Sequence, residues 1–143
     1  MDLEKIYIIN GPNLNLVGLR QPEIYGDLSF EEYIPTLRLA NPTIYIEYFQ
    51  SNHEGVLIDF IHTIGFEAHN KAIINAGGFS HTSIAIADAL ASVPMEFVEV
   101  HLSDITQRES FRKHSYITAH ALKMISGKGM EGYREAIQFL LAK

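Results

Sequence analysis

The sequence contains no cysteine among its 143 residues. Neither a disulfide framework nor a thiolate metal site can therefore form, which fits a reducing compartment. Positive charge is also scarce: 11 Lys and Arg stand against 17 Asp and Glu, with a formal net charge of −6 and no basic block. This balance argues against nucleic acid or an acidic membrane as the main partner. No apolar run approaches the roughly 20 residues of a transmembrane helix, and the charged N-terminus is unlike a signal peptide, so we expect a cytoplasmic protein.

Short apolar runs alternate along the chain with segments of helical periodicity. The length suits one domain, residues 1–143. The pattern predicts a five-stranded parallel sheet with helices on both faces. The expected strands are residues 6–9, 43–49, 72–74, 96–100 and 121–125, and the expected helices are residues 30 to the late 30s, 56–64, 82–91 and 130–142.

Two candidate capping boxes mark helix starts. Ser29 is followed three residues later by Glu32, and Ser51 by Glu54. In a capping box, the serine hydroxyl and the glutamate carboxylate each accept a hydrogen bond from a backbone N–H at the start of the helix. We therefore expect a helix after each serine.

Ligands of parallel α/β folds bind beyond the carboxyl ends of the strands. The segments expected there are residues 10–27, 50–53, 75–82, 101–115 and 126–129. They hold most of the candidate polar chemistry of the chain: Asn10, Asn13, Arg20, Tyr25, Asn75, His81, His101, Ser103 and Arg112. We therefore expect one site at that edge of the sheet.

The segment 10–27 is longer than the 2–6 residues usual between a strand and a helix. Gly18 and Gly26 flank Arg20 and Tyr25, so the segment could act as a lid over a ligand. A nearby arginine lowers the pKa of a tyrosine, which could then serve as a general base. The alternative is an ordinary surface loop.

Glu99 and His101 lie two residues apart in the fourth expected strand, so they share one face. A carboxylate beside an imidazole fixes its tautomer and favours its protonated form, which makes it a better acid. A lone histidine at a strand end is otherwise more often structural.

Asn75 and His81 bracket a glycine-containing turn whose N–H groups could meet polar ligand atoms. The alternative is a tight turn in which Thr82 or Ser83 caps the helix that follows.

Several further patterns suggest other functions. Gly127 to Gly132 matches G-x-G-x-x-G, but the chain ends before the expected acidic residue, so the glycines fit close packing of the last helix better. A nucleotide- or flavin-binding module stays open as the alternative. A metal-dependent hydrolase using His81, Asp88 and His101 is a third reading, although no H-E-x-x-H motif is present. Arg112 is a candidate clamp for a carboxylate, within a polar segment expected to be mostly solvated.

The chain resembles the type II 3-dehydroquinate dehydratases over nearly its whole length. The resemblance rests on ordered motifs: Asn10-Gly11-Pro12-Asn13-Leu14-Asn15-Leu16 with Gly18, Arg20, Pro22, Tyr25 and Gly26; Gln50-Ser51-Asn52-His53-Glu54-Gly55; Ile74-Asn75-Ala76-Gly77-Gly78-Phe79-Ser80-His81-Thr82-Ser83 with Asp88-Ala89-Leu90; Glu99-Val100-His101-Leu102-Ser103 with Arg108-Glu109 and Phe111-Arg112-Lys113-His114-Ser115; and Gly127, Gly129, Gly132 and Tyr133.

The resemblance implies a flavodoxin-like fold and conversion of 3-dehydroquinate to 3-dehydroshikimate in the shikimate pathway, without a cofactor or a metal. It implies catalytic roles for Tyr25 as base, Arg20 as the group that keeps it ionised, Asn13 at the enolate, His101 as acid and Glu99 as its orienting partner. It implies substrate-binding roles for Asn75, His81, Asp88, Leu102, Ser103 and Arg112.

The resemblance also implies a homo-oligomer, a dodecamer built from trimers, in which Asp88 reaches the site of a neighbouring subunit. Two positions depart from the family pattern. Gln21 stands where glutamate is frequent in the lid, and Asp104 stands where asparagine is common. We expect Asp104 to add negative charge near an anionic substrate.

Overall fold

The computed structural model describes residues 3–19, 28–67 and 69–143, and its centre is one parallel sheet. The strand order is β2-β1-β3-β4-β5, with every neighbouring pair parallel. The strands are β1 (Glu4–Asn10), β2 (Ile44–Gln50), β3 (Asn70–Asn75), β4 (Glu96–His101) and β5 (Lys123–Ser126). This confirms the predicted flavodoxin-like α/β fold.

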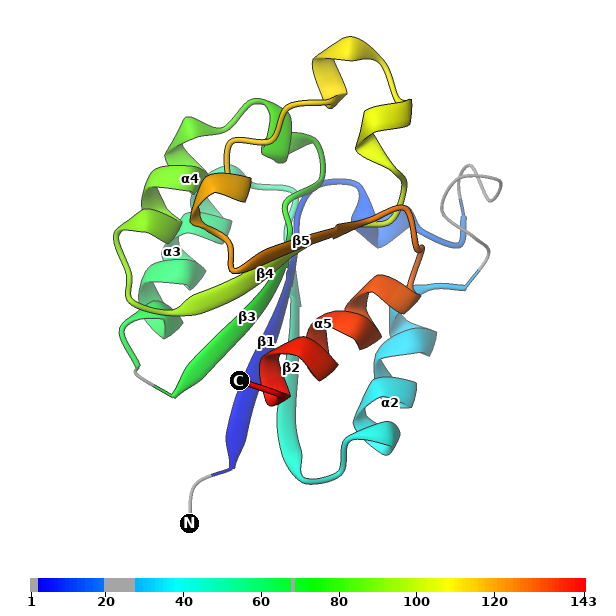
Figure 1. Ribbon diagram of the computed structural model, residues 1–143, viewed down its shortest axis with the longest axis vertical. Helices are drawn as coiled ribbons and strands as arrows, with labels where there is room; N and C mark the ends of the chain where they lie inside the picture. The colour runs from blue at the N-terminus through cyan, green and yellow to red at the C-terminus, as the bar shows by residue number, and fades with distance from the viewer. Residues whose placement is uncertain (1–2, 20–27, 68) are drawn as a thin grey trace.

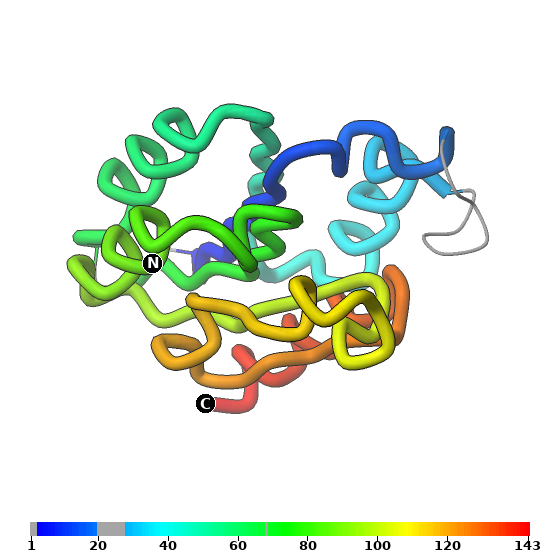
Figure 2. Tube along the Cα trace, turned by 90° about the horizontal axis from the view of Figure 1, so that it is seen from above, coloured from blue at the N-terminus to red at the C-terminus, as the bar shows by residue number. Residues whose placement is uncertain are grey.

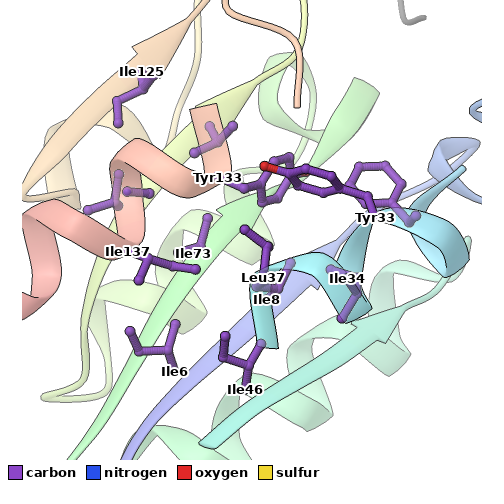
Figure 3. Packing of buried hydrophobic residues seen from close by; sticks show 14 of the residues in the cluster. Ile6, Ile8, Tyr33, Ile34, Leu37, Ile46, Ile73, Ile125, Tyr133 and Ile137 are labelled. Atoms are coloured by element: carbon purple, nitrogen blue, oxygen red, sulfur yellow. The ribbon is translucent and has the colours of Figure 1, made fainter. Parts of the chain in front are cut away.

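Within the described residues, four α-helices cover the sheet, two on each face (Figure 1). They are α2 (Phe30–Ala40), α3 (Glu54–Gly65), α4 (Ile84–Ala91) and α5 (Glu131–Leu141). Helices α2 and α5 pack with one set of strand side chains, and α3 and α4 pack with the opposite set. Figure 3 shows five strand isoleucines of the first set: Ile6, Ile8, Ile46, Ile73 and Ile125. Among the described residues, no helix has the length and apolar character that crossing a bilayer requires.

Irregular segments and short 3-10 helices lie where the strands end, and Figure 2 views the molecule from that side. They are η1 (Leu14–Leu16), η2 (Gly77–His81), η3 (Ile105–Gln107), η4 (Ser110–Arg112) and η5 (Thr118–His120). The long connection between β4 and β5 contains three of them. These segments supply most of the polar residues discussed below.

The two predicted capping boxes have different outcomes. At Ser29 the box is present: its hydroxyl accepts from the Glu32 N–H, and the Glu32 carboxylate accepts from the Ser29 N–H. The box at Ser51 is wrong. The Ser51 hydroxyl accepts from the His53 N–H at 3.0 Å, and α3 begins at Glu54 itself. The Ser51 hydroxyl is therefore used in a turn before the helix, and α3 has no side-chain cap.

The glycine-rich connection before α5 serves packing, as predicted for Gly132. A Cβ atom on Gly132 would lie 3.2 Å from the Val100 Cγ1 atom and 3.5 Å from the Ile125 Cγ2 atom. The first turn of α5 therefore lies directly on strands β4 and β5. Gly127 and Gly129 have positive φ angles of 81° and 57°, and their N–H groups donate to the carbonyls at the end of β4. Positive φ is accessible to glycine at little steric cost.

Candidate active site

A polar cavity of about 290 Å³ opens at the carboxyl ends of β1, β3 and β4. It lies where ligands of this fold type bind. Its lining is Pro12, Asn13, Leu14, Asn75, Gly77, Gly78, His81, His101, Leu102, Ser103, Ile105, Arg108, Glu109 and Arg112. Seven of the residues predicted from the sequence are therefore brought together: Asn13, Asn75, His81, His101, Leu102, Ser103 and Arg112.

His101 and Glu99 form a buried pair at the end of β4. The His101 Nε2 atom lies 2.5 Å from Glu99 Oε2, and Glu99 has no solvent exposure. An ionised carboxylate only accepts hydrogen bonds, so the Nε2–H of His101 is the donor. The other ring nitrogen, Nδ1, is then left for a proton exchanged with a ligand.

Two hydroxyl groups complete the environment of the Glu99 carboxylate. Ser115 donates to Oε2 and Thr118 donates to Oε1. Burial by itself raises the pKa of Glu99, but the hydrogen bonds from His101, Ser115 and Thr118 together bring that pKa below its ordinary value. Glu99 is therefore charged at neutral pH and accepts the hydrogen bond that orients the His101 ring. Sequence reasoning missed Ser115 and Thr118 as partners of Glu99, because they lie in an irregular segment without periodicity.

His81 faces the same cavity, and a hydrogen bond fixes its tautomer. Its Nδ1 atom lies 2.7 Å from the His114 carbonyl oxygen, which can only accept, so Nδ1 carries the proton. Burial, the largest influence, lowers the pKa of His81. The neutral ring then offers Nε2 as an acceptor for a ligand hydroxyl. The His81 and His101 rings are stacked with centroids 6.2 Å apart, so the two imidazoles lie next to each other at the cavity.

Two asparagines enter the cavity from strand ends. Asn75 is buried, and its Oδ1 atom accepts from the Gly77 N–H at 3.1 Å. Asn13 has the only positive φ angle, 69°, among the described residues other than glycine. Asparagine tolerates this conformation better than most residues. The Asn13 N–H donates to the Asn52 Oδ1 atom at 2.9 Å, which ties the loop after β1 to the loop after β2.

The cavity has two arginines, not only the predicted Arg112. The Arg112 Nε–H donates to the Glu109 carboxylate, and its guanidinium lies 5.1 Å from the centroid of the Phe111 ring. Arg108 donates from Nη1 to the Ser103 hydroxyl at 3.0 Å and also lines the cavity. Lys113 and His114 are exposed, as expected for a mostly solvated segment, whereas Arg108 and Arg112 are half-buried.

Glu99 contacts His101 but is not part of the cavity lining, and three further predicted residues are not placed in the cavity. Arg20 and Tyr25 lie outside the described residues. Asp88 is exposed on α4 and does not line the cavity that the described residues form. In the same part of the chain, no group of three or more His, Asp or Glu side chains lies close enough to hold a metal ion.

Asp104 lies between Ser103 and Ile105, two residues that line the cavity. Its carboxylate accepts from the Thr106 N–H at 2.9 Å and from the Thr106 hydroxyl, and it thereby caps η3. These hydrogen bonds lower the pKa of Asp104. Asp104 is not one of the residues found in the cavity lining. Gln21, the other departure, lies outside the described residues.

The family model described as dehydroquinase class II matches residues 4–141. The chain belongs to the class II dehydroquinase family. It is 48% identical over 142 residues to the 3-dehydroquinate dehydratase of Herminiimonas arsenicoxydans, covering 98% of each chain. It is 46% identical to that of Halothermothrix orenii, covering 97% of this chain and 95% of the relative.

Solved structures of class II dehydroquinases share this fold. The type II dehydroquinase of Butyrivibrio crossotus superposes with a TM-score of 0.92 at 40% identity, covering 97% of this chain and 98% of that one. The enzyme of Propionibacterium acnes gives a TM-score of 0.92 at 34% identity, with 98% and 97% covered. The chain therefore has both the sequence and the fold of a class II dehydroquinase.

Proposed function

We propose that this cavity dehydrates 3-dehydroquinate to 3-dehydroshikimate, with His101 as the acid. The class II family assigns the activity itself: a hydro-lyase of the shikimate pathway, as expected from the sequence. The buried pair of Glu99 and His101 is the observation that carries the residue assignment. A charged, fully buried carboxylate at 2.5 Å from an imidazole both orients the ring and stabilises its protonated form.

The reaction needs a base before it needs that acid. By its resemblance to the family, Tyr25 removes a proton from the carbon beside the ketone, with Arg20 favouring tyrosinate. The electron pair of the broken C–H bond forms an enolate, which Asn13 helps to stabilise through an ordered water. A donor placed at a developing oxyanion typically contributes about 10²–10³-fold in rate.

The second step expels the hydroxyl group. The enolate electrons return to form the conjugated ketone, and the bond between carbon and the hydroxyl oxygen breaks. His101 delivers a proton from Nδ1 to that oxygen, so that water leaves. Proton delivery by a positioned acid contributes typically about 10²–10⁴-fold. No cofactor takes part in this proposal.

The other polar groups hold the substrate. Neutral His81 accepts from a substrate hydroxyl through Nε2, and Asn75 and Arg112 supply donors. Leu102 supplies a backbone contact and Ser103 a hydroxyl for the carboxylate. This division is supported by their common position around one cavity.

The proposal also includes an oligomer in which subunits share residues of the site. Asp88 lies on an exposed face of α4, and it acts in the site of a neighbouring subunit within a dodecamer of trimers. Residues 1–143 then form one catalytic domain, and the enzyme works in the cytoplasm. The resemblance to the family motivates each of these statements.

The experiment follows the ultraviolet absorbance of the conjugated product. Purified wild type, Tyr25→Phe and His101→Ala are mixed with 3-dehydroquinate in the presence of a strong chelator. We expect turnover by the wild type and losses in kcat of about 10²–10⁴-fold in each variant. His62→Ala, an exposed histidine of α3, serves as the matched control and should retain full activity. An inactive, correctly folded wild type would refute the proposal.

A further inference from the structure

Tyr133 is a buried tyrosine that the proposed reaction does not use. It lies in the first turn of α5 with no solvent exposure, and Figure 3 shows it in the core between α2, α5 and the sheet. Its hydroxyl lies 2.7 Å from the Asn10 Oδ1 atom and 3.0 Å from the Asn75 Nδ2 atom. Asn10 and Asn75 are register partners at the ends of β1 and β3. The phenol therefore links two strand ends, one of which lines the cavity.

Donor and acceptor can be assigned for each hydrogen bond that links Asn75, Tyr133 and Asn10. The Gly77 N–H can only donate, so the oxygen of the Asn75 amide faces Gly77 and its nitrogen faces Tyr133. The phenol oxygen accepts from that nitrogen, so its proton goes to the Asn10 Oδ1 atom. The Asn10 Nδ2 atom in turn lies 3.4 Å from the Tyr48 hydroxyl. Burial raises the pKa of the Tyr133 phenol, which keeps its proton in place.

These hydrogen bonds use only part of the hydrogen-bonding capacity of the Asn75 amide. An amide has two N–H groups and two oxygen lone pairs. Gly77 uses one lone pair, and Tyr133 uses one N–H. One N–H of a side chain that cannot rotate is then left for a ligand in the cavity. A preorganised donor binds with less loss of conformational entropy than a free one.

We infer that Tyr133 is a positioning residue for substrate binding, which holds the Asn75 amide so that its second N–H meets an acceptor oxygen of the bound hydroxy-keto acid. The inference rests on the proposed role of Asn75 as a substrate ligand. Tyr133 does not itself belong to the cavity lining found among the described residues. It acts only through Asn75.

Tyr133→Phe tests the inference with 3-dehydroquinate as the probe. Removing the hydroxyl leaves the Asn10 oxygen and the Asn75 nitrogen without their partner, and the amide can rotate. We expect KM to rise about tenfold, with kcat changed less than about threefold, because the lost interaction belongs to binding. The loss should disappear in the Asn75→Ala background, since coupled residues are not additive.

Tyr33→Phe is the matched control. The Tyr33 hydroxyl donates to the Met130 carbonyl oxygen at 2.9 Å within the same core cluster, without reaching Asn75. Its removal should leave KM unchanged while costing similar stability in thermal unfolding. If Tyr133→Phe fails to fold, Asn10→Leu takes its place, because it removes the acceptor of the Tyr133 proton. That variant should also raise KM.

The outcomes distinguish a failure of the positioning role of Tyr133 from a failure of the substrate-binding role of Asn75. If Asn75→Ala raises KM and Tyr133→Phe behaves like Tyr33→Phe, the positioning role is refuted and the substrate role of Asn75 stands. If Asn75→Ala leaves KM unchanged, the substrate role is refuted and the inference with it. An additive further rise of KM in the double variant Tyr133→Phe/Asn75→Ala would also overturn it, because Tyr133 would then act by another route.

Discussion

Glu99 is a charged side chain in a fully buried position, and such a placement is costly unless its hydrogen bonds are complete. Here His101, Ser115 and Thr118 all point donors at the same carboxylate. A buried ion pair is weak evidence for stability, because an apolar pair of similar volume often does as well. The position of this pair beside a cavity therefore fits the proposed role of His101 better than a role in stability.

Glu99→Gln separates charge from shape at this position. The amide fills the same volume but cannot stabilise a protonated His101 ring, and it presents an N–H to groups that donate. We expect kcat to fall about 10–100-fold with KM nearly unchanged. Steady-state absorbance kinetics measure both. Glu96→Gln, at the exposed start of the same strand, is the control; a kcat for Glu99→Gln equal to that control would contradict the role.

The lowered pKa of Glu99 predicts how the free energy of unfolding changes at acidic pH. The pKa of Glu99 is lower in the folded protein than in the unfolded chain. Its stabilising contribution is therefore complete above the unfolded pKa, about 4.3, and is lost as the pH falls through the folded pKa. In Glu99→Gln, the free energy of unfolding should fall less steeply below that pH, by up to about 1.4 kcal/mol per pH unit. Urea titrations at a series of acidic pH values check this, and equal slopes in both proteins would refute it.

At the residue scale, regular periodicity decided what could be predicted. Glu99 and His101 lie in a strand, where alternation alone places them on one face, and they do meet. Arg108 and Ser115 lie in the irregular connection between β4 and β5. No repeat fixes the direction of a side chain there, so neither their contacts nor the ion pair of Arg112 could be derived from spacing.

At the scale of elements, the close approach of the β1 end to the turn after β3 shapes the cavity. A Cβ atom on Gly11 would lie 2.3 Å from the Ala76 carbonyl oxygen, and the Gly11 N–H donates to the Asn75 carbonyl oxygen at 2.7 Å. Both groups are backbone and cannot rotate away. The turn that holds Asn75 is therefore fixed against the loop that holds Asn13.

Gly11→Ala should separate these two elements. We expect a loss of about 2 kcal/mol or more in stability, together with weaker substrate binding. Gly55→Ala is the matched control, since its Cβ atom would meet nothing within 4 Å near the start of α3. Alanine there should stabilise the protein by up to about 1 kcal/mol. Thermal unfolding of both variants checks the contrast, and a Gly11→Ala protein as stable as the wild type would contradict it.

Helix starts show where local sequence suffices and where it does not. The sequences Ser29 to Glu32 and Ser51 to Glu54 satisfy the same pattern, yet only the first forms a capping box. At Ser51 the strand β2 ends at Gln50 and leaves no room for a separate cap, because Ser51 N–H still donates to the Asn10 carbonyl oxygen at 3.1 Å. Strand pairing then sets where α3 begins.

At the scale of the whole molecule, the order of elements along the chain predicted the sheet. Alternating strands and helices require parallel strands with helices on both faces, and the structure has α2 and α5 on one face and α3 and α4 on the other. A single sequence contains no comparable pattern for contacts between subunits. The proposed role of Asp88 therefore depends on assembly, and its test must involve two chains.

Complementation between inactive chains provides that test. If each site combines His101 of one subunit with Asp88 of a neighbour around a three-fold axis, homomers of His101→Ala and of Asp88→Ala are both impaired. When the two chains are unfolded, mixed in equal amounts and refolded together, about a quarter of the sites should contain both native residues. Absorbance assays of the mixture should then recover about a quarter of wild-type activity. If Asp88 acts within its own subunit, every site keeps one lesion, and the mixture should be no more active than the two homomers refolded separately.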